Sequence, residues 1–76
     1  MSAWRLEDAM VIVVNGERRD VTEGTTVRQL LDQVGVNPLL VAVEVNVEIL
    51  LREQYAGTIL RHGDTVEIVH MVGGGA

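Results

Sequence analysis

The chain has 76 residues, and its six Lys or Arg against eleven Asp or Glu give a net charge of −5. This length allows one domain with a small core, and the negative charge argues against a nucleic acid or an anionic membrane surface as partner. The absence of cysteine excludes disulfides, zinc–thiolate sites and thiol nucleophiles, and no apolar run or leader pattern directs the chain to a membrane, so a cytoplasmic location is expected.

The first part of the chain is expected to form a β-hairpin. Residues 1–9 show no alternation of apolar and polar side chains, so we expect an extension outside the core. Two extended runs follow, residues 10–14 and 17–21, separated by Asn15-Gly16. Asn-Gly is the preferred two-residue hairpin turn, because both central residues must take positive φ.

A single amphipathic helix is predicted after the hairpin. Thr26 and Gln29 have the spacing of a capping box, in which each side chain accepts a hydrogen bond from a free backbone N–H. Four apolar residues at helical spacing form one buried face: Val27, Leu30, Leu31 and Val34. Gly35 is expected to end the helix in the left-handed conformation, and Pro38 to prevent it from restarting.

The rest of the domain is expected to be mostly extended. The expected elements are strands over residues 40–45, 47–51 and 65–72, a helical turn or loop over residues 52–57 and a turn at Gly63-Asp64. A helix with one apolar stripe needs one sheet face to cover it, and the crossover into the next strand is normally right-handed. The order predicts an α+β domain over residues 10–72 with a β-grasp (ubiquitin-like) fold, a mixed sheet of about four or five strands with one main helix on one face.

The final strand leads directly into a glycine-rich tail, residues 73–76. Glycine is costly to order and packs no side chain, so its consecutive glycines do not stabilise the fold. The tail is either a frayed end or a thin tip that presents the terminal carboxylate. Activation of a carboxylate by phosphoryl transfer needs metal and basic groups, which this acidic chain does not provide as a cluster, so the enzyme must be another protein.

Several segments together resemble the thiamine-biosynthesis sulfur carrier proteins of the ThiS type, within the ubiquitin-like ThiS/MoaD family. They are the Asn15-Gly16 hairpin, the helix over 26–34, the strand over 41–46, Arg52-Glu53-Gln54-Tyr55, Gly63-Asp64 and the ending over 67–74. The likeness covers residues 10–75. It implies a protein co-substrate that is not an enzyme and has no cofactor of its own.

The resemblance also implies a site and its partners. In that family an E1-like, ATP-dependent adenylyltransferase adenylates the terminal glycine, which becomes a thiocarboxylate and gives its sulfur to thiazole synthase; a cysteine desulfurase is a typical sulfur donor. Gly75 is then the acceptor and Gly74 its neighbour in the enzyme's channel. Ala76 departs from the family's glycine ending, and we expect it to be trimmed by a peptidase or to be foreign to the natural chain; a working alanine terminus is the alternative.

Alternation in the final strand predicts a docking surface for these partners. If Val66 and Ile68 face the helix, the residues between and after them face outward. Exposed Val and Met side chains beside the tail would form an apolar surface suited to partner binding. The alternative is that they are two unrelated apolar residues on the surface, which is common in soluble proteins. The predicted partner-binding residues are Glu67, Val69, Met71, Val72 and Gly73.

Other features of the sequence carry less functional information. His62 and His70 lie on either side of the Gly63-Asp64 turn, but no further ligand or nucleophile accompanies them, so no metal site is predicted. Two other functions stay open: a sulfur carrier for a related route, such as molybdopterin, tRNA or amino-acid thiolation, and a ubiquitin-like interaction module with a non-reactive tail.

Overall fold

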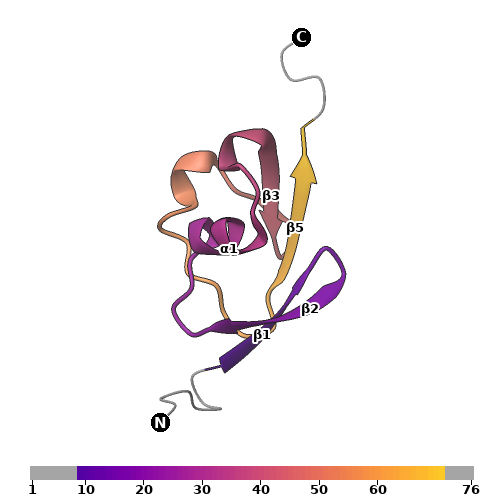
Figure 1. The fold of residues 1–76 in the computed structure, drawn as a ribbon, viewed down its shortest axis with the longest axis vertical. Coiled ribbons are helices and arrows are strands. Elements are labelled where there is room, and N and C mark those ends of the chain that lie inside the picture. Colours follow the sequence, from indigo (N-terminus) through magenta and orange to yellow (C-terminus); the bar gives the residue numbers. More distant parts are fainter. Residues whose placement is uncertain (1–8, 72–76) are drawn as a thin grey trace.

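The computed structural model describes residues 9–71. One sheet of five strands in the order β2-β1-β5-β3-β4 is covered on one face by helix α1 (Figure 1). The elements are β1 (Ala9–Val14), β2 (Glu17–Thr22), α1 (Val27–Val34), the 3-10 turn η2 (Pro38–Leu40), β3 (Val41–Val45), β4 (Glu48–Ile49), the 3-10 turn η3 (Arg52–Gln54) and β5 (Thr65–His70).

The hairpin predicted from the Asn-Gly pair is present. Strands β1 and β2 pair antiparallel along their whole length, and Asn15 (φ 50°) and Gly16 (φ 83°) both have positive φ. Strand β1 begins one residue earlier than expected, because Ala9, which was assigned to the N-terminal extension, pairs with Thr22. The other residues of the expected extension lie outside the described part of the chain.

Helix α1 begins and ends as its sequence predicts. Thr26 Oγ1 accepts a hydrogen bond from the Gln29 N–H at 3.1 Å, and Gln29 Oε1 accepts one from the Thr26 N–H at 2.9 Å. Gly35 ends the helix with φ 81°, and its N–H donates to the carbonyl of Leu31. Within residues 9–71 the α-helix does not restart after Gly35; Pro38 instead begins the short 3-10 turn η2, because the first position of a helix does not need the N–H that proline lacks.

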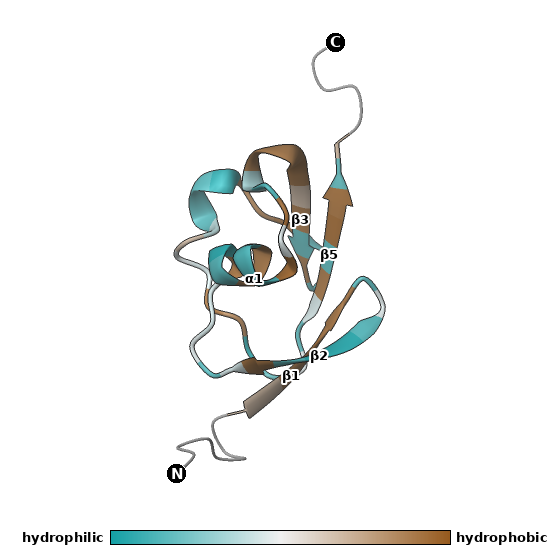
Figure 2. Ribbon diagram, viewed as in Figure 1, coloured by the Kyte–Doolittle hydropathy of each residue, from teal (hydrophilic) through white to brown (hydrophobic). Residues whose placement is uncertain are grey.

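Aliphatic side chains form the core between α1 and the sheet. In β3 and β5 the side chains alternate between the core and the outward face, and Figure 2 shows apolar residues along these strands and polar residues along β2. Burying one such aliphatic side chain contributes about 1.5–3 kcal/mol, so this layer is the main source of stability. The largest fully buried side chains belong to Ile12, Val27, Leu30, Leu31, Val43, Leu60 and Val66.

The strand order places β5, the last strand, in the middle of the sheet. Strand β5 is parallel to β1 and antiparallel to β3, while β2 and β4 form the two edges. A mixed sheet with one helix packed on one face is the β-grasp arrangement, and the predicted fold is therefore confirmed.

The later strands are shorter than predicted. Strand β4 covers Glu48–Ile49 instead of residues 47–51, because Asn46 (φ 52°) and Val47 (φ 72°) both have positive φ and form the turn before it. Positive φ is rare for a β-branched residue, so the alternation gave no sign of it at Val47. Strand β5 ends at His70, before its predicted end.

Side-chain hydrogen bonds connect this turn to the start of β5. Asn46 Nδ2 donates to Asp64 Oδ1 at 2.9 Å, and Asn46 Oδ1 accepts from the Thr65 N–H at 2.9 Å. Asp64 Oδ2 accepts from the Arg61 N–H at 2.8 Å. The predicted Gly63-Asp64 turn is therefore held from two sides, which fixes where β5 begins.

Candidate functional site

The end of β5 is the part of the structure from which the glycine tail departs, and the strand is held there on both sides. On the β3 side, the Met71 N–H donates to the Leu40 carbonyl at 2.9 Å. On the other side, β1 ends and the side chain of Asn15 replaces a strand neighbour. Its Nδ2 donates to the Ile68 carbonyl at 3.1 Å and its Oδ1 accepts from the Ile68 N–H at 2.7 Å.

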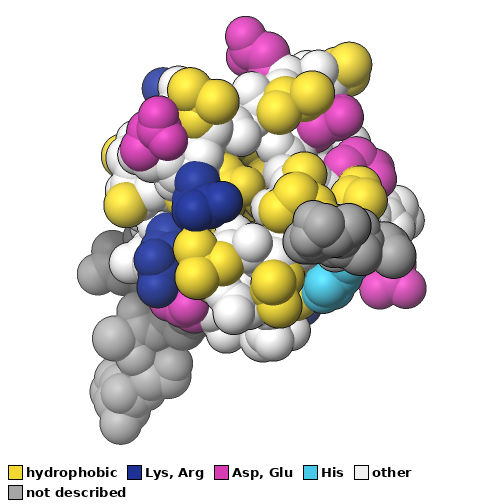
Figure 3. Space-filling model, turned by 90° about the horizontal axis from the view of Figure 1, so that it is seen from above, with side chains coloured by type: hydrophobic (Ala, Val, Ile, Leu, Met, Phe, Trp, Pro, Cys, Tyr) yellow, Lys and Arg dark blue, Asp and Glu magenta, His cyan; other side chains and the backbone are white. Residues whose placement is uncertain are grey.

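The outward face of β5 carries the exposed side chains that alternation predicts. Glu67 is exposed, Val69 is 56% exposed and Met71 is 49% exposed. Leu40, which the sequence analysis did not include, is 54% exposed beside Met71. We call Leu40, Val69 and Met71 the apolar patch. From the end of the molecule at which β5 finishes, Figure 3 shows exposed hydrophobic side chains with basic side chains among them on one side and acidic ones mostly towards the rim.

Two carboxylates lie next to each other on the same outward face. Glu44 of β3 is directly opposite Glu67 of β5 in the antiparallel register. Like charges at directly opposite positions destabilise a sheet, so this pair does not serve the fold. It gives the face beside the apolar patch a negative charge that a basic partner surface can complement.

The predicted residues of the tail are not part of this geometry. Val72, Gly73, Gly74 and Gly75 lie outside the described residues, as does Ala76. Their roles in the reaction and in partner binding therefore stay predictions. The described structure contributes the root of the tail and the surface around it.

The segment that contributed most to the family resemblance has structural roles. Gln54 Oε1 accepts from the Leu51 N–H at 2.8 Å, and the Tyr55 side chain is buried in the core. The Tyr55 hydroxyl is 3.5 Å from the Val41 carbonyl oxygen, a long hydrogen bond at the start of β3. The Tyr55 carbonyl accepts from the Arg28 N–H at 3.0 Å. These contacts tie η3 to α1 and to the start of β3.

The two histidines do not form a site together. His62 Nδ1 accepts a hydrogen bond from the Val11 N–H at 3.0 Å, which is a structural role, whereas His70 is exposed at the far end of β5. Within residues 9–71, no group of three or more His, Cys, Asp or Glu side chains is placed to hold a metal ion. In the same range no helix is long and apolar enough to cross a membrane.

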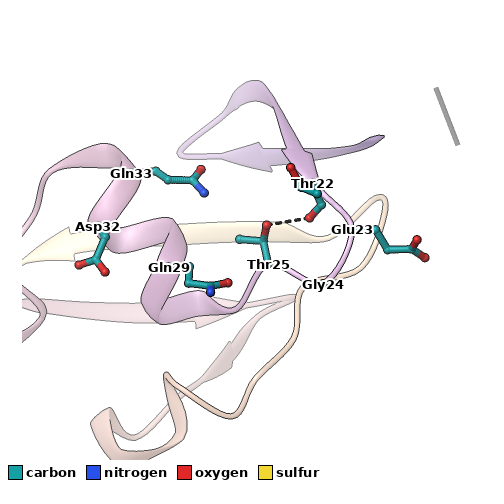
Figure 4. A pocket seen from close by; sticks show the side chains of 7 residues that line it. All are labelled: Thr22, Glu23, Gly24, Thr25, Gln29, Asp32 and Gln33. Carbon is teal, nitrogen blue, oxygen red and sulfur yellow. Dashed lines mark hydrogen bonds between the residues drawn. The ribbon is translucent and has the colours of Figure 1, made fainter. Parts of the chain in front are cut away.

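A hollow lies between the β2–α1 loop and the helix. Glu23 and Asp32 lie on opposite sides of it (Figure 4), and Thr25 Oγ1 donates to the Thr22 carbonyl at 2.7 Å. Its lining consists of hydroxyl, amide and carboxylate groups around Gly24, with no basic side chain. We assign it no role.

Comparison with known proteins points to one family. The model of the ThiS family matches residues 12–75. The sulfur carrier protein ThiS of Thermus thermophilus is 38% identical over 86% of this chain and 100% of its own length. A crystal structure of the thiamine biosynthesis protein ThiS from Geobacter metallireducens has a TM-score of 0.76 at 36% identity, covering 87% of this chain and 100% of that one.

A second kind of relative is much longer. A protein of Paramagnetospirillum magneticum named thiazole synthase is 43% identical over 67 residues. This segment is 88% of the present chain, which spans about a fifth of that protein's length (21%). The similarity therefore concerns one domain of the longer protein.

Proposed function

This chain belongs to the ThiS family, and we propose that it is a sulfur carrier protein of thiamine biosynthesis, a co-substrate whose Gly75 carboxylate is activated and loaded with sulfur. The observation that carries the proposal is the end of β5. This central strand is held by β3 up to Met71 and by Asn15 on its other side up to Ile68, and it leads into the glycine run beside the apolar patch. Fully extended, the next four residues reach about 14 Å, so the terminus can enter a buried active site while the sheet stays outside.

The proposed chemistry occurs at the terminal carboxylate. Its oxygen attacks the α-phosphorus of ATP and pyrophosphate leaves, which gives an acyl-adenylate on an E1-like adenylyltransferase. The terminal sulfur of a persulfide, formed on a donor such as a cysteine desulfurase, then attacks the carbonyl carbon and AMP leaves, which gives an acyl disulfide. A thiol of the partner enzymes attacks the donor's sulfur in this S–S bond, so that the donor leaves as a disulfide and the other sulfur stays on the carbonyl carbon. The product is a thiocarboxylate that transfers its sulfur to the substrate of thiazole synthase. Glycine suits this path because it has no Cβ to obstruct a narrow channel.

The proposed partners dock on the outward face of the sheet. The apolar patch would be buried against the adenylyltransferase and thiazole synthase, with Glu44 and Glu67 facing basic side chains of these enzymes. The similarity to a segment of a protein named thiazole synthase supports that partner, because it indicates that the two functions work together.

The reaction is tested with a chain that ends at Gly75. Incubated with ATP, a ThiS-activating adenylyltransferase and a sulfur donor, it should gain an adenylate and then exchange one oxygen for sulfur, as measured by intact mass. Removing Gly75 should abolish the exchange, because the carboxylate is drawn back by roughly 3.5 Å and reacting atoms tolerate much less displacement. Gly74→Val should fold but react slowly, since a branched side chain obstructs the channel.

A comparison of chains that end at Gly75 and at Ala76 distinguishes the remaining alternatives. A chain that retains Ala76 should stay unreactive until it is trimmed. Equal reaction with and without Ala76 would make alanine the working terminus. No thiolation of either form by any ThiS-activating enzyme would contradict the carrier function and leave the interaction-module alternative.

The docking surface is tested separately by charge insertion. Val69→Asp and Met71→Asp should weaken binding to thiazole synthase at least tenfold, because a desolvated charge faces an apolar contact. Ile59→Asp is the matched control, since Ile59 is 57% exposed but does not belong to the patch. Equal weakening of binding by all three variants would refute the assignment. A clearly lower urea midpoint for the two patch variants would also refute it, because it would show that these side chains belong to the core.

A further inference from the structure

A groove on the helix side of β5 has no role in the proposed function. It encloses about 220 Å³ between the hairpin, the end of α1 and β5. Its floor is apolar and its rim is polar. The lining residues are Val14, Val34, Val36 and Ile68 on the floor and Asn15, Glu17, Arg18, Arg19 and His70 around it.

The hairpin contributes charged residues to this groove in a protein of net charge −5. Arg18, Arg19 and Glu17 all line it, and of the two arginines only Arg19 is directed to the helix side by its strand pairing. Arg19 pairs with the buried Ile12 in the hairpin, which directs its side chain to the helix side of the sheet. Its Nε is buried and has no hydrogen-bond partner among the described residues. Buried donors are normally paired, so this N–H indicates an acceptor that arrives from outside.

The groove also exposes an open strand edge. Strand β1 pairs with β5 at Val13↔Thr65 and Val14↔Val66, and after that the Asn15 side chain occupies the edge at Ile68. Backbone groups of a strand alternate between its two sides, so the N–H and C=O of His70 point to the same side as those of Ile68. Among the described residues no strand lies next to His70 there.

We propose that this groove binds an extended, acidic segment of a partner protein. The backbone of the segment pairs with His70, next to the Asn15 side chain, which already occupies this side of β5 at Ile68. One carboxylate accepts hydrogen bonds from Arg19, including the buried Nε–H, and an apolar side chain covers Val34 and Val36. The site faces away from the apolar patch, so a partner can hold the carrier here while another enzyme occupies the outward face.

An acidic extended peptide fits these features better than a small anion. Among residues 9–71 no strand pairs with the backbone groups of His70 on this side, and strand addition to an exposed edge would supply a backbone partner. A carboxylate is the planar acceptor that a guanidinium binds with two parallel hydrogen bonds. Side chains of an added strand alternate, so neighbouring positions can place one carboxylate and one apolar group.

The test is a titration of the full chain, labelled with ¹⁵N, with a blocked hexapeptide of alternating glutamate and valine. The largest NMR shift changes should be at the His70 amide, the Asn15 side-chain amide and the Arg19 Nε–H. Arg19→Gln should weaken binding about tenfold or more, because it removes charge-assisted hydrogen bonds. Arg61→Gln, which changes an exposed arginine outside the groove, should leave the affinity within about twofold.

Further controls make each outcome decisive. A glutamine–valine peptide of the same length should not bind, and acetate at the same carboxylate concentration should not reproduce the shifts. Arg19→Lys keeps the charge but lacks the guanidinium Nε–H, so it should bind the peptide with intermediate affinity. If Arg19→Lys keeps part of the affinity, the loss of binding in Arg19→Gln reflects the missing charge and hydrogen bonds and not a folding defect. Binding of the glutamine peptide, acetate-induced shifts of equal size, or shifts confined to the apolar patch would overturn the proposal. No ATP or sulfur is involved, so this result is independent of the carrier function.

Discussion

Val47 is a residue at which the sequence opposes the local structure, and replacing it should stabilise the protein. Its φ of 72° is left-handed, which costs an L-residue roughly 1–2 kcal/mol and is least tolerated by β-branched side chains. Its side chain is 89% exposed, so truncating it loses only about a few tenths of a kcal/mol of burial. Asparagine adopts this conformation readily. We therefore expect Val47→Asn to raise the free energy of unfolding by about 1 kcal/mol, or the Tm by roughly 4–8 °C.

The measurement is the urea midpoint at unchanged m value. Val69→Asn is the matched control, because Val69 is also exposed (56%) but lies in the regular strand β5; asparagine there should be neutral or destabilising. Val47→Gly should gain less than Val47→Asn, since glycine also increases the entropy of the unfolded chain. If Val47→Asn behaves like the strand control, the turn is not strained and the reasoning is wrong.

Two further predictions concern the start of the chain and the clamp on β5. Deleting residues 1–8 should leave the urea midpoint almost unchanged. A deletion that also removes Ala9 and the buried Met10 should lower the free energy of unfolding by about 2–5 kcal/mol. A large loss of stability from the shorter deletion would show that the N-terminal residues belong to the core. Asn15→Asp keeps a turn-forming residue but loses the donor to the Ile68 carbonyl, so it should destabilise by about 1–3 kcal/mol in urea unfolding at neutral pH. Asp20→Asn, on the exposed part of β2, should have little effect, and equal values for the two variants would contradict the clamp.

The parts of the fold that the sequence predicted depend on neighbouring residues. The Asn15-Gly16 turn and the Thr26–Gln29 capping box are each complete within a few positions. The second role of Asn15 is not visible in this way, because Ile68 is 53 residues away and meets it only after the sheet has assembled. The short β4 was missed for the opposite reason, since the local pattern at Val47 favours a strand and the tertiary structure imposes a turn.

The candidate site likewise contains residues that the local pattern predicts and residues that only the assembled sheet brings together. Alternation in β5 was enough to predict that Glu67, Val69 and Met71 are exposed. Leu40 joins them only through the pairing of β3 with β5. The groove around Arg19 combines the hairpin, α1 and β5, and its charge could not be read from the Arg18-Arg19 pair, which resembles an ordinary solvent-exposed hairpin.

The central position of β5 also bears on when the protein becomes functional during its synthesis. A nascent chain emerges from its N-terminal end and folds as its segments become available. The hairpin and α1 emerge early, but β1 and β3 have no strand between them until residues 65–70 are released. Under the proposed function, the surface that partners recognise is therefore complete only after residues 65–71 have been released. Under the proposed function, a chain that stops before residue 65 would lack this surface and would therefore not be bound by the proposed activating enzyme.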